Sequence, residues 1–132
     1  MKNILGISGG TRPGNQDSAA TIISNGEITA CAEEERFIRI KHAPGVLPEN
    51  AIRYCLKQAG LDIKDVDCIV FAGATYDSMK QILTNFFNFK FGYCPDIFLI
   101  DHHLAHASSS YYASGFDNSF IITADFSGDK IG

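Results

Sequence analysis

The first third of the chain alternates short apolar runs with turn residues, a pattern typical of strands. An apolar run over Lys2–Ser8 stops at Gly9-Gly10, as a buried strand would. The segments Ser18–Ser24 and Glu27–Glu33 flank Asn25-Gly26. This dipeptide favours a two-residue type I′ turn, because both central positions of that turn need positive φ. The pattern therefore predicts three strands in a meander, of which the last two form a tight hairpin.

From Pro48 onward, helical spacing alternates with short buried runs. Pro48 at a first-turn position predicts a helix that ends at Gly60. Apolar residues at i, i+3, i+4 and i+7 from Met79 indicate a second helix, with Asp77 or Ser78 as its N-cap. The remaining expected elements are the strands Val66–Ala72, Ile97–Ile100 and Ser119–Asp125 and a short helix over Leu104–Ala113.

The order of these elements predicts the fold class. Three strands lead, and helices and strands alternate after them. This order matches an α/β ribonuclease-H-like half domain of the actin-like ATPase kind, with a mixed sheet, better than a doubly wound nucleotide fold. We expect residues 1–115 to form the first half and residues 116–132 to be the opening strand and turn of a second half that is largely absent from these 132 residues.

Composition narrows the classes of function. An apolar content of 45% with 20% charged residues suits one domain with its own core. The formal charge of −4 argues against nucleic acid as a partner, because phosphate neutralisation needs clustered positive charge. The apolar runs are too short for a membrane helix or a signal peptide, so a cytoplasmic protein is expected. Four cysteines without a Cys-x-x-Cys pair predict buried thiols.

Histidines gather at the junction of an expected strand and helix. Three of the four histidines lie in the run Asp101-His102-His103-Leu104-Ala105-His106. A helix that begins at His102 projects His102 and His106 from one face, where both imidazoles can share a metal ion. Asp125, at the end of the last expected strand, is the third ligand for such a site. Polar residues at a helix start, with one ring bonded to backbone, are the alternative. His103 faces elsewhere and is expected either to be structural or to orient a metal ligand.

Two further polar segments carry candidate binding groups. The turn Ser127-Gly128-Asp129 offers backbone N–H groups that either contact phosphate or only link two strands. The segment Glu33–His42 gathers cationic side chains, among them Lys41. From the residues alone, this segment is a solvated and self-paired charge cluster.

Several motifs together resemble the N-terminus of the nodulation and antibiotic-biosynthesis carbamoyltransferases. They occur in the family's order and approximate spacing along the whole chain. The motifs are Ile4–Ser8, Gln16–Ala20, Ala32–Phe37, Arg39–His42, Asp101–Ala107, and Asp125 with Gly128.

The resemblance implies a domain similar to the tRNA threonylcarbamoyl transferase, in which two ribonuclease-H-like halves enclose a nucleotide and a divalent metal. The metal is of the iron type, with zinc or manganese as alternatives. A separate C-terminal domain would form carbamoyl adenylate from carbamoyl phosphate and ATP. The N-terminal domain would then transfer the carbamoyl group to a hydroxyl of a small-molecule acceptor.

By motif, the resemblance assigns His102, His106 and Asp125 as metal ligands, with a fourth, an aspartate, in a longer chain. Residues 127–129 would contact the nucleotide. Lys41 would face the carbamoyl group or the phosphate. Assembly as a homodimer stays open.

One position departs from the family pattern. The family loop usually carries a histidine directly before Asp-Ser as general base on the acceptor hydroxyl, whereas this chain has Gln16. Glutamine can position an acceptor and cannot deprotonate it. Asp17 either replaces the base or organises the loop through backbone hydrogen bonds. A non-catalytic metal- or nucleotide-binding module, or a partner-subunit module of the same superfamily, is therefore the alternative function.

Overall fold

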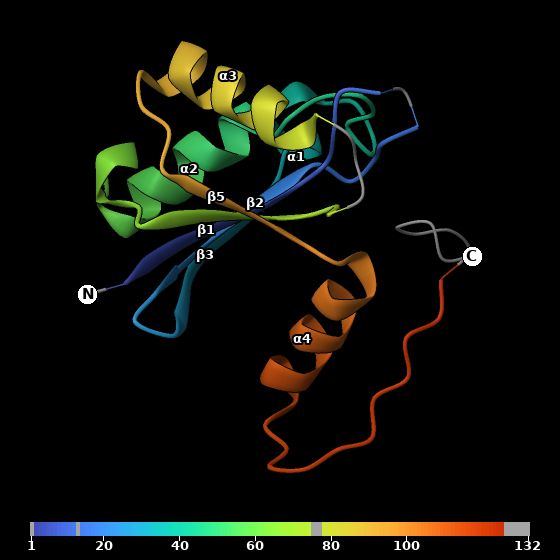
Figure 1. The fold of residues 1–132 in the computed structure, drawn as a ribbon. Coiled ribbons are helices and arrows are strands. Elements are labelled where there is room, and N and C mark those ends of the chain that lie inside the picture. Colours follow the sequence, from blue (N-terminus) through green and yellow to red (C-terminus); the bar gives the residue numbers. More distant parts are fainter. Residues whose placement is uncertain (1, 13, 75–77, 126–132) are drawn as a thin grey trace.

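A computed structural model describes residues 2–12, 14–74 and 78–125. These residues form a five-stranded mixed sheet in the order β3-β2-β1-β4-β5 (Figure 1). The strands are β1 (Asn3–Ser8), β2 (Ala19–Ser24), β3 (Glu27–Glu33), β4 (Cys68–Ala72) and β5 (Asp96–Ile100). The helices are α1 (Glu35–Ile38), α2 (Glu49–Ala59), α3 (Met79–Phe91) and α4 (His102–Ser114), with a 3₁₀ turn at Ile63–Asp65.

Strand direction gives the sheet one functional edge. β1 pairs in parallel with β4, and β4 pairs in parallel with β5. β2 runs antiparallel to both β1 and β3. The ends of β1, β4 and β5 therefore meet at one edge, together with the start of β2 and the end of β3. We call this the carboxyl edge.

The core lies between the sheet and two helices. α2 and α3 cover one face of the sheet, and α4 extends on the opposite side (Figure 1). Leu5 of β1, Ile69 of β4 and Phe87 of α3 are fully buried in one apolar cluster. In contrast, α4 has no buried residue. The expected ribonuclease-H-like fold class is confirmed, since three leading strands precede the alternation of helices and strands.

The predicted hairpin is present at Asn25 and Gly26. Their φ values are 54° and 88°, so both central residues have the positive φ that a type I′ turn needs. Asn25 N–H also donates to the Lys2 carbonyl at 2.9 Å, which holds the turn against the start of β1.

Several expected elements differ from the structure. Residues 119–125 form no strand, because no described segment pairs with them and a strand needs a hydrogen-bonded partner. Whether residues 116–132 open a second half stays a prediction. The short helix α1 was not expected, and α4 begins two residues earlier than expected. Ser78 makes no capping hydrogen bond through its side chain, and Asp77 lies outside the described residues.

The cysteines confirm the expectation of buried thiols only in part. Cys55 is fully buried, and this burial raises the pKa of its thiol to about 11. Cys68 and Cys94 are half-buried, and burial raises the pKa of each. Cys31 is exposed, because Ala30 and Ala32 on either side of it in β3 pack against the core and the alternation of the strand turns Cys31 to the opposite face of the sheet. No helix of the described chain has the length and apolar character needed to cross a bilayer.

Glu34 links the hairpin to α2 through a buried carboxylate. The residue is only 2% exposed. Its carboxylate accepts hydrogen bonds from the backbone N–H of Asn50 and of Ala51, at 3.2 and 2.8 Å, and from the Asn50 side chain. Pro48, at the N-cap, makes no side-chain cap. Glu34 therefore supplies from a distance the acceptor and the negative charge that the amino end of α2 lacks.

We expect Glu34→Ala to lower the free energy of unfolding by about 2–3 kcal/mol, because it leaves buried N–H donors of α2 without an acceptor. Urea unfolding followed by circular dichroism measures this change. Glu27→Gln, on the exposed hairpin, serves as the control and should have little effect. Equal stability of the two variants would show that the Glu34 carboxylate does not support α2.

Candidate functional site

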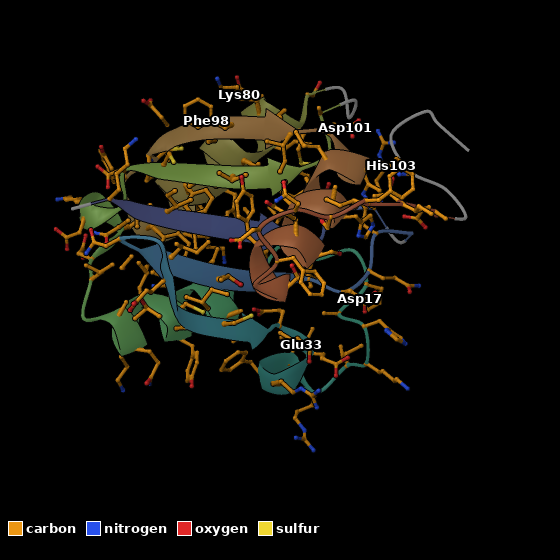
Figure 2. All side chains as sticks on the ribbon, turned by 90° about the horizontal axis from the view of Figure 1, so that it is seen from below. Asp17, Glu33, Lys80, Phe98, Asp101 and His103 are labelled. Carbon is orange, nitrogen blue, oxygen red and sulfur yellow. The ribbon has the colours of Figure 1, made fainter. Side chains whose placement is uncertain are left out.

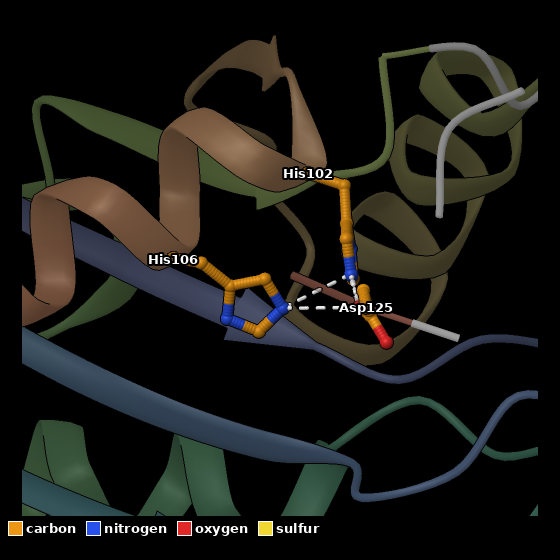
Figure 3. Close-up of side chains that lie close together, drawn as sticks. All are labelled: His102, His106 and Asp125. Carbon is orange, nitrogen blue, oxygen red and sulfur yellow. Dashed lines mark hydrogen bonds and ion pairs between the residues drawn. The ribbon is translucent and has the colours of Figure 1, made fainter. Parts of the chain in front are cut away.

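His102, His106 and Asp125 converge beyond the carboxyl edge, and we call them the cluster (Figure 3). The Nε2 atoms of the two histidines lie 3.0 Å apart. Oδ2 of Asp125 lies 2.6 Å from His102 Nε2 and 3.3 Å from His106 Nε2. The side chains are 31%, 55% and 29% exposed in chain order, so solvent and small molecules reach them. The structure thus brings His102 and His106, four positions apart, together with Asp125, which lies 23 positions after His102.

The start of α4 decides how the two histidines are arranged. Asp101 directly follows β5, and its side chain accepts a hydrogen bond from Leu104 N–H at 2.9 Å, which caps the helix. The helix therefore begins at His102. One turn later, His106 projects from the same face, as the spacing predicts.

A second contact holds the segment that carries Asp125. After α4 the chain turns back along the helix (Figure 1). His103 Nδ1 and Thr123 Oγ1 lie at hydrogen-bond distance, 3.0 Å, two positions before Asp125. His103 Nε2 is buried and has no hydrogen-bond partner among the described residues. His103 therefore has a structural contact: it connects α4 to the segment that carries Asp125.

The donor atoms of the cluster suit a transition metal. Two imidazole nitrogens and a carboxylate oxygen are ligands that zinc, iron and manganese accept. Around a zinc ion, such atoms would lie about 3.3 Å from one another. The separations of 3.0 and 3.3 Å to His106 Nε2 are close to that spacing, whereas the 2.6 Å between His102 Nε2 and Asp125 Oδ2 is that of a direct hydrogen bond and would widen around an ion. The residues fit a metal, and that they bind one stays a prediction.

The other predicted residues lie on two loops. Gln16 and Asp17 are exposed and lie in the loop before β2, separated from the strand by Ser18. Lys41 is exposed and makes no ion pair with any described residue. Ser127, Gly128 and Asp129 lie outside the described residues.

The two loops are joined by a pair that the sequence analysis did not find. Asp17 Oδ1 and His42 Nδ1 lie 2.9 Å apart, and the Asp17 N–H donates to the His42 carbonyl at 2.7 Å. Asp17 thus contacts a side chain as well as backbone. No local spacing reveals a pair 25 positions apart. The only sequence signal is that Asp17 lies in the loop that leads into β2 and His42 in the connection that follows β3 and α1, and both connections start or end at the carboxyl edge.

Both groups of residues share the carboxyl edge. Figure 2 shows Asp17, Asp101 and His103 at the end of the sheet toward which β1, β4 and β5 run. β4 separates β1 from β5, so the ends of these two strands are about 10 Å apart. An open groove of about 650 Å³ lies elsewhere, along α3 and β5 between Lys80 and Phe98. It contains no residue of the cluster.

Comparisons with known proteins agree with the sequence motifs and with the fold. A family model described as the carbamoyltransferase N-terminus matches residues 3–89. The nodulation protein NolNO of Sinorhizobium fredii is 36% identical over 135 residues, which cover 86% of this chain and 20% of that protein. An uncharacterised protein of Synechocystis is 29% identical over 98% of this chain and 26% of its own length. The chain therefore spans about a fifth to a quarter of these relatives.

A solved structure supports the fold alone. YeaZ from Pseudomonas aeruginosa superposes with a TM-score of 0.55 at 16% identity and covers 87% of this chain and 51% of its own. The family match ends within α3, before the cluster. The arrangement of His102, His106 and Asp125 is therefore an observation of the structure, independent of that match.

Thr123→Val removes the hydroxyl that meets His103 and should loosen the segment that carries Asp125. Loss of one hydrogen bond, worth about 1 kcal/mol, should increase local opening about fivefold. Limited chymotrypsin digestion at Phe116 and Phe120, both exposed, measures this rate. Ser119→Ala in the same segment is the control. Unchanged digestion of Thr123→Val would show that His103 does not hold the segment.

Proposed function

The chain belongs to the carbamoyltransferase N-terminal family, and on this basis we propose that it is the N-terminal part of an enzyme that carbamoylates a hydroxyl of a small-molecule acceptor. The proposed donor is carbamoyl adenylate, formed from carbamoyl phosphate and ATP in a C-terminal domain. The observation that carries this proposal is the convergence of His102, His106 and Asp125 beyond the carboxyl edge of a ribonuclease-H-like sheet. In open α/β sheets, ligands bind outside the carboxyl ends of the strands.

We propose that the cluster holds a divalent metal of the iron type, with zinc or manganese as alternatives. His102, His106 and Asp125 would be its ligands, and a further aspartate would come from a longer chain. A bound metal would supply positive charge that orients the phosphate of the nucleotide and neutralises it. The exposure of the three side chains leaves access for that phosphate.

The loop residues would bind the reacting groups. The Lys41 ammonium is exposed and not ion-paired with any described residue, so it is available to the carbamoyl oxygen or to the phosphate. The Gln16 amide both donates and accepts hydrogen bonds and would orient the acceptor hydroxyl. Ser127, Gly128 and Asp129 would contact the nucleotide phosphate through backbone N–H groups.

A second candidate is a non-catalytic module that binds metal or nucleotide. Gln16 favours it, because an amide does not remove a proton from an acceptor. Calorimetry with ATP and with carbamoyl phosphate, followed by a turnover assay, separates the two candidates. Binding without any carbamoyl transfer would favour the module.

We expect His106→Ala to weaken metal binding by at least about 10-fold, because even residues that only orient metal ligands contribute that much. The longest natural form of the protein is loaded anaerobically with Fe²⁺, or separately with Zn²⁺, and bound metal is measured by mass spectrometry across a titration. Tyr112→Ala changes an exposed residue of the same helix and should bind metal normally. Equal affinity of the two variants would reject the metal assignment.

Lys41→Ala should reduce carbamoyl transfer by about 100-fold, in the range known for the loss of one charge-stabilising donor. The longest natural form of the protein is supplied with labelled carbamoyl phosphate, ATP and a panel of sugars and polyols, and AMP and carbamate ester are quantified. Lys57→Ala, exposed on α2, is the matched control. Absence of AMP release from the unsubstituted protein would reject carbamoyl adenylate as the donor.

A further inference from the structure

His42 is the histidine outside the run at residues 102–106, and the structure pairs it with Asp17. We call these two residues the dyad. Its side chains are 49% and 74% exposed, so the pair faces solvent at the carboxyl edge. The backbone joins the same two residues, since Asp17 N–H donates to the His42 carbonyl at 2.7 Å. Side-chain and backbone contacts thus hold one geometry across two loops.

Both residues of the dyad adopt a backbone conformation that residues other than glycine rarely take. The φ values are 56° for Asp17 and 63° for His42, in the left-handed region. Such positions in residues other than glycine are strained and persist where surrounding contacts impose them. Ser8 Oγ donates to the Asp17 carbonyl at 2.8 Å, and the His42 N–H donates to Glu35 Oε2 at 2.7 Å. These contacts fix the pair from β1 and from α1.

The hydrogen bond at Nδ1 of His42 leaves the other ring nitrogen, Nε2, available to accept a proton. A carboxylate at Nδ1 favours the tautomer with the proton on Nδ1, so that Nε2 carries the lone pair. No described residue occupies His42 Nε2, and the ring is half-exposed. The charged groups around His42 are Asp17 at the ring, Glu35 at its backbone N–H and the neighbouring Lys41. The arrangement is that of a proton acceptor with a fixed direction.

We propose that His42 is the general base of the carbamoyl transfer and that Asp17 is its positioning residue. This inference rests on the proposed function. His42 Nε2 takes the proton of the acceptor hydroxyl as the hydroxyl oxygen bonds to the carbamoyl carbon. The bond between that carbon and the phosphate oxygen breaks, and AMP leaves with the electron pair. The acceptor is thus a neutral alcohol, whose proton must be removed for attack.

The location of the dyad agrees with this role. Ser8, which binds Asp17, ends β1, whereas His102 follows the end of β5. The intervening strand β4 gives these ends a separation of about 10 Å. This separation has room for carbamoyl adenylate with its phosphate near the cluster and its carbamoyl group near the dyad. The acceptor alcohol would then lie beside the dyad. Gln16, next to Asp17, would orient the same hydroxyl that His42 deprotonates.

The test compares nucleophiles that differ in their need for a base. The longest natural form of the protein receives carbamoyl phosphate and ATP, and AMP release is followed with water and glycerol and, separately, with hydroxylamine. Hydroxylamine attacks as an unprotonated amine and needs no general base. His42→Gln should lose about 100-fold or more with water and glycerol and keep most of its rate with hydroxylamine. Asp17→Asn should show a smaller loss of the same kind.

Controls separate a base from a structural residue. Lys57→Gln, on α2, should behave as the unsubstituted protein with every nucleophile. If His42→Gln does not fold by circular dichroism, His42→Asn replaces it, because asparagine tolerates the left-handed conformation.

Four outcomes would overturn the proposal. A folded His42→Gln variant whose rates are unchanged shows that His42 is not a base. The same conclusion follows if this variant loses the reactions with hydroxylamine and with water or glycerol equally. Unsubstituted protein that turns over hydroxylamine alone shows that no base acts. Unsubstituted protein that releases no AMP even with hydroxylamine shows instead that the proposed transfer itself is wrong.

Discussion

Parallel pairing of β1, β4 and β5 is the constraint that organises this molecule. Their inward side chains, such as Leu5, Ile69 and Ile97, are buried against α2 and α3, so strand register and direction are tied to the core. Three strand ends consequently meet at one edge. The candidate functional residues of the described chain lie on segments that leave or enter this edge, except Asp125, which reaches it on the segment that follows α4.

The cluster and the dyad at that edge are positioned in two different ways. His102 and His106 are arranged by local geometry, since a helix that begins directly after β5 stacks residues four apart. Asp17 and His42 are arranged by loop packing, in which a carbonyl, a hydroxyl and the Glu35 carboxylate hold two residues at positive φ. The first arrangement needs one helix. The second needs β1, α1 and both loops at once.

Glu34 connects this loop packing to the stability of the core. Its backbone N–H donates to the Ser18 carbonyl at 2.8 Å, next to Asp17, while its carboxylate binds the amino end of α2. The same turn continues into α1, which carries Glu35 and leads to Lys41 and His42. A buried carboxylate therefore joins the element that covers the sheet to the loop that presents the dyad.

Elements whose causes are local can be predicted from the sequence alone. Asn25-Gly26 specifies its turn, and the spacing of His102 and His106 places both rings on one face, because each depends on residues within one turn of the chain. The position of Asp125 was expected for a different reason from the one observed. It reaches the cluster on a segment that folds back along α4 and meets His103 through Thr123, with no strand in the described chain. This return of the chain and the Asp17–His42 pair become visible only in the folded molecule, because contacts between residues 20 or more positions apart are set by packing and leave no periodic signal.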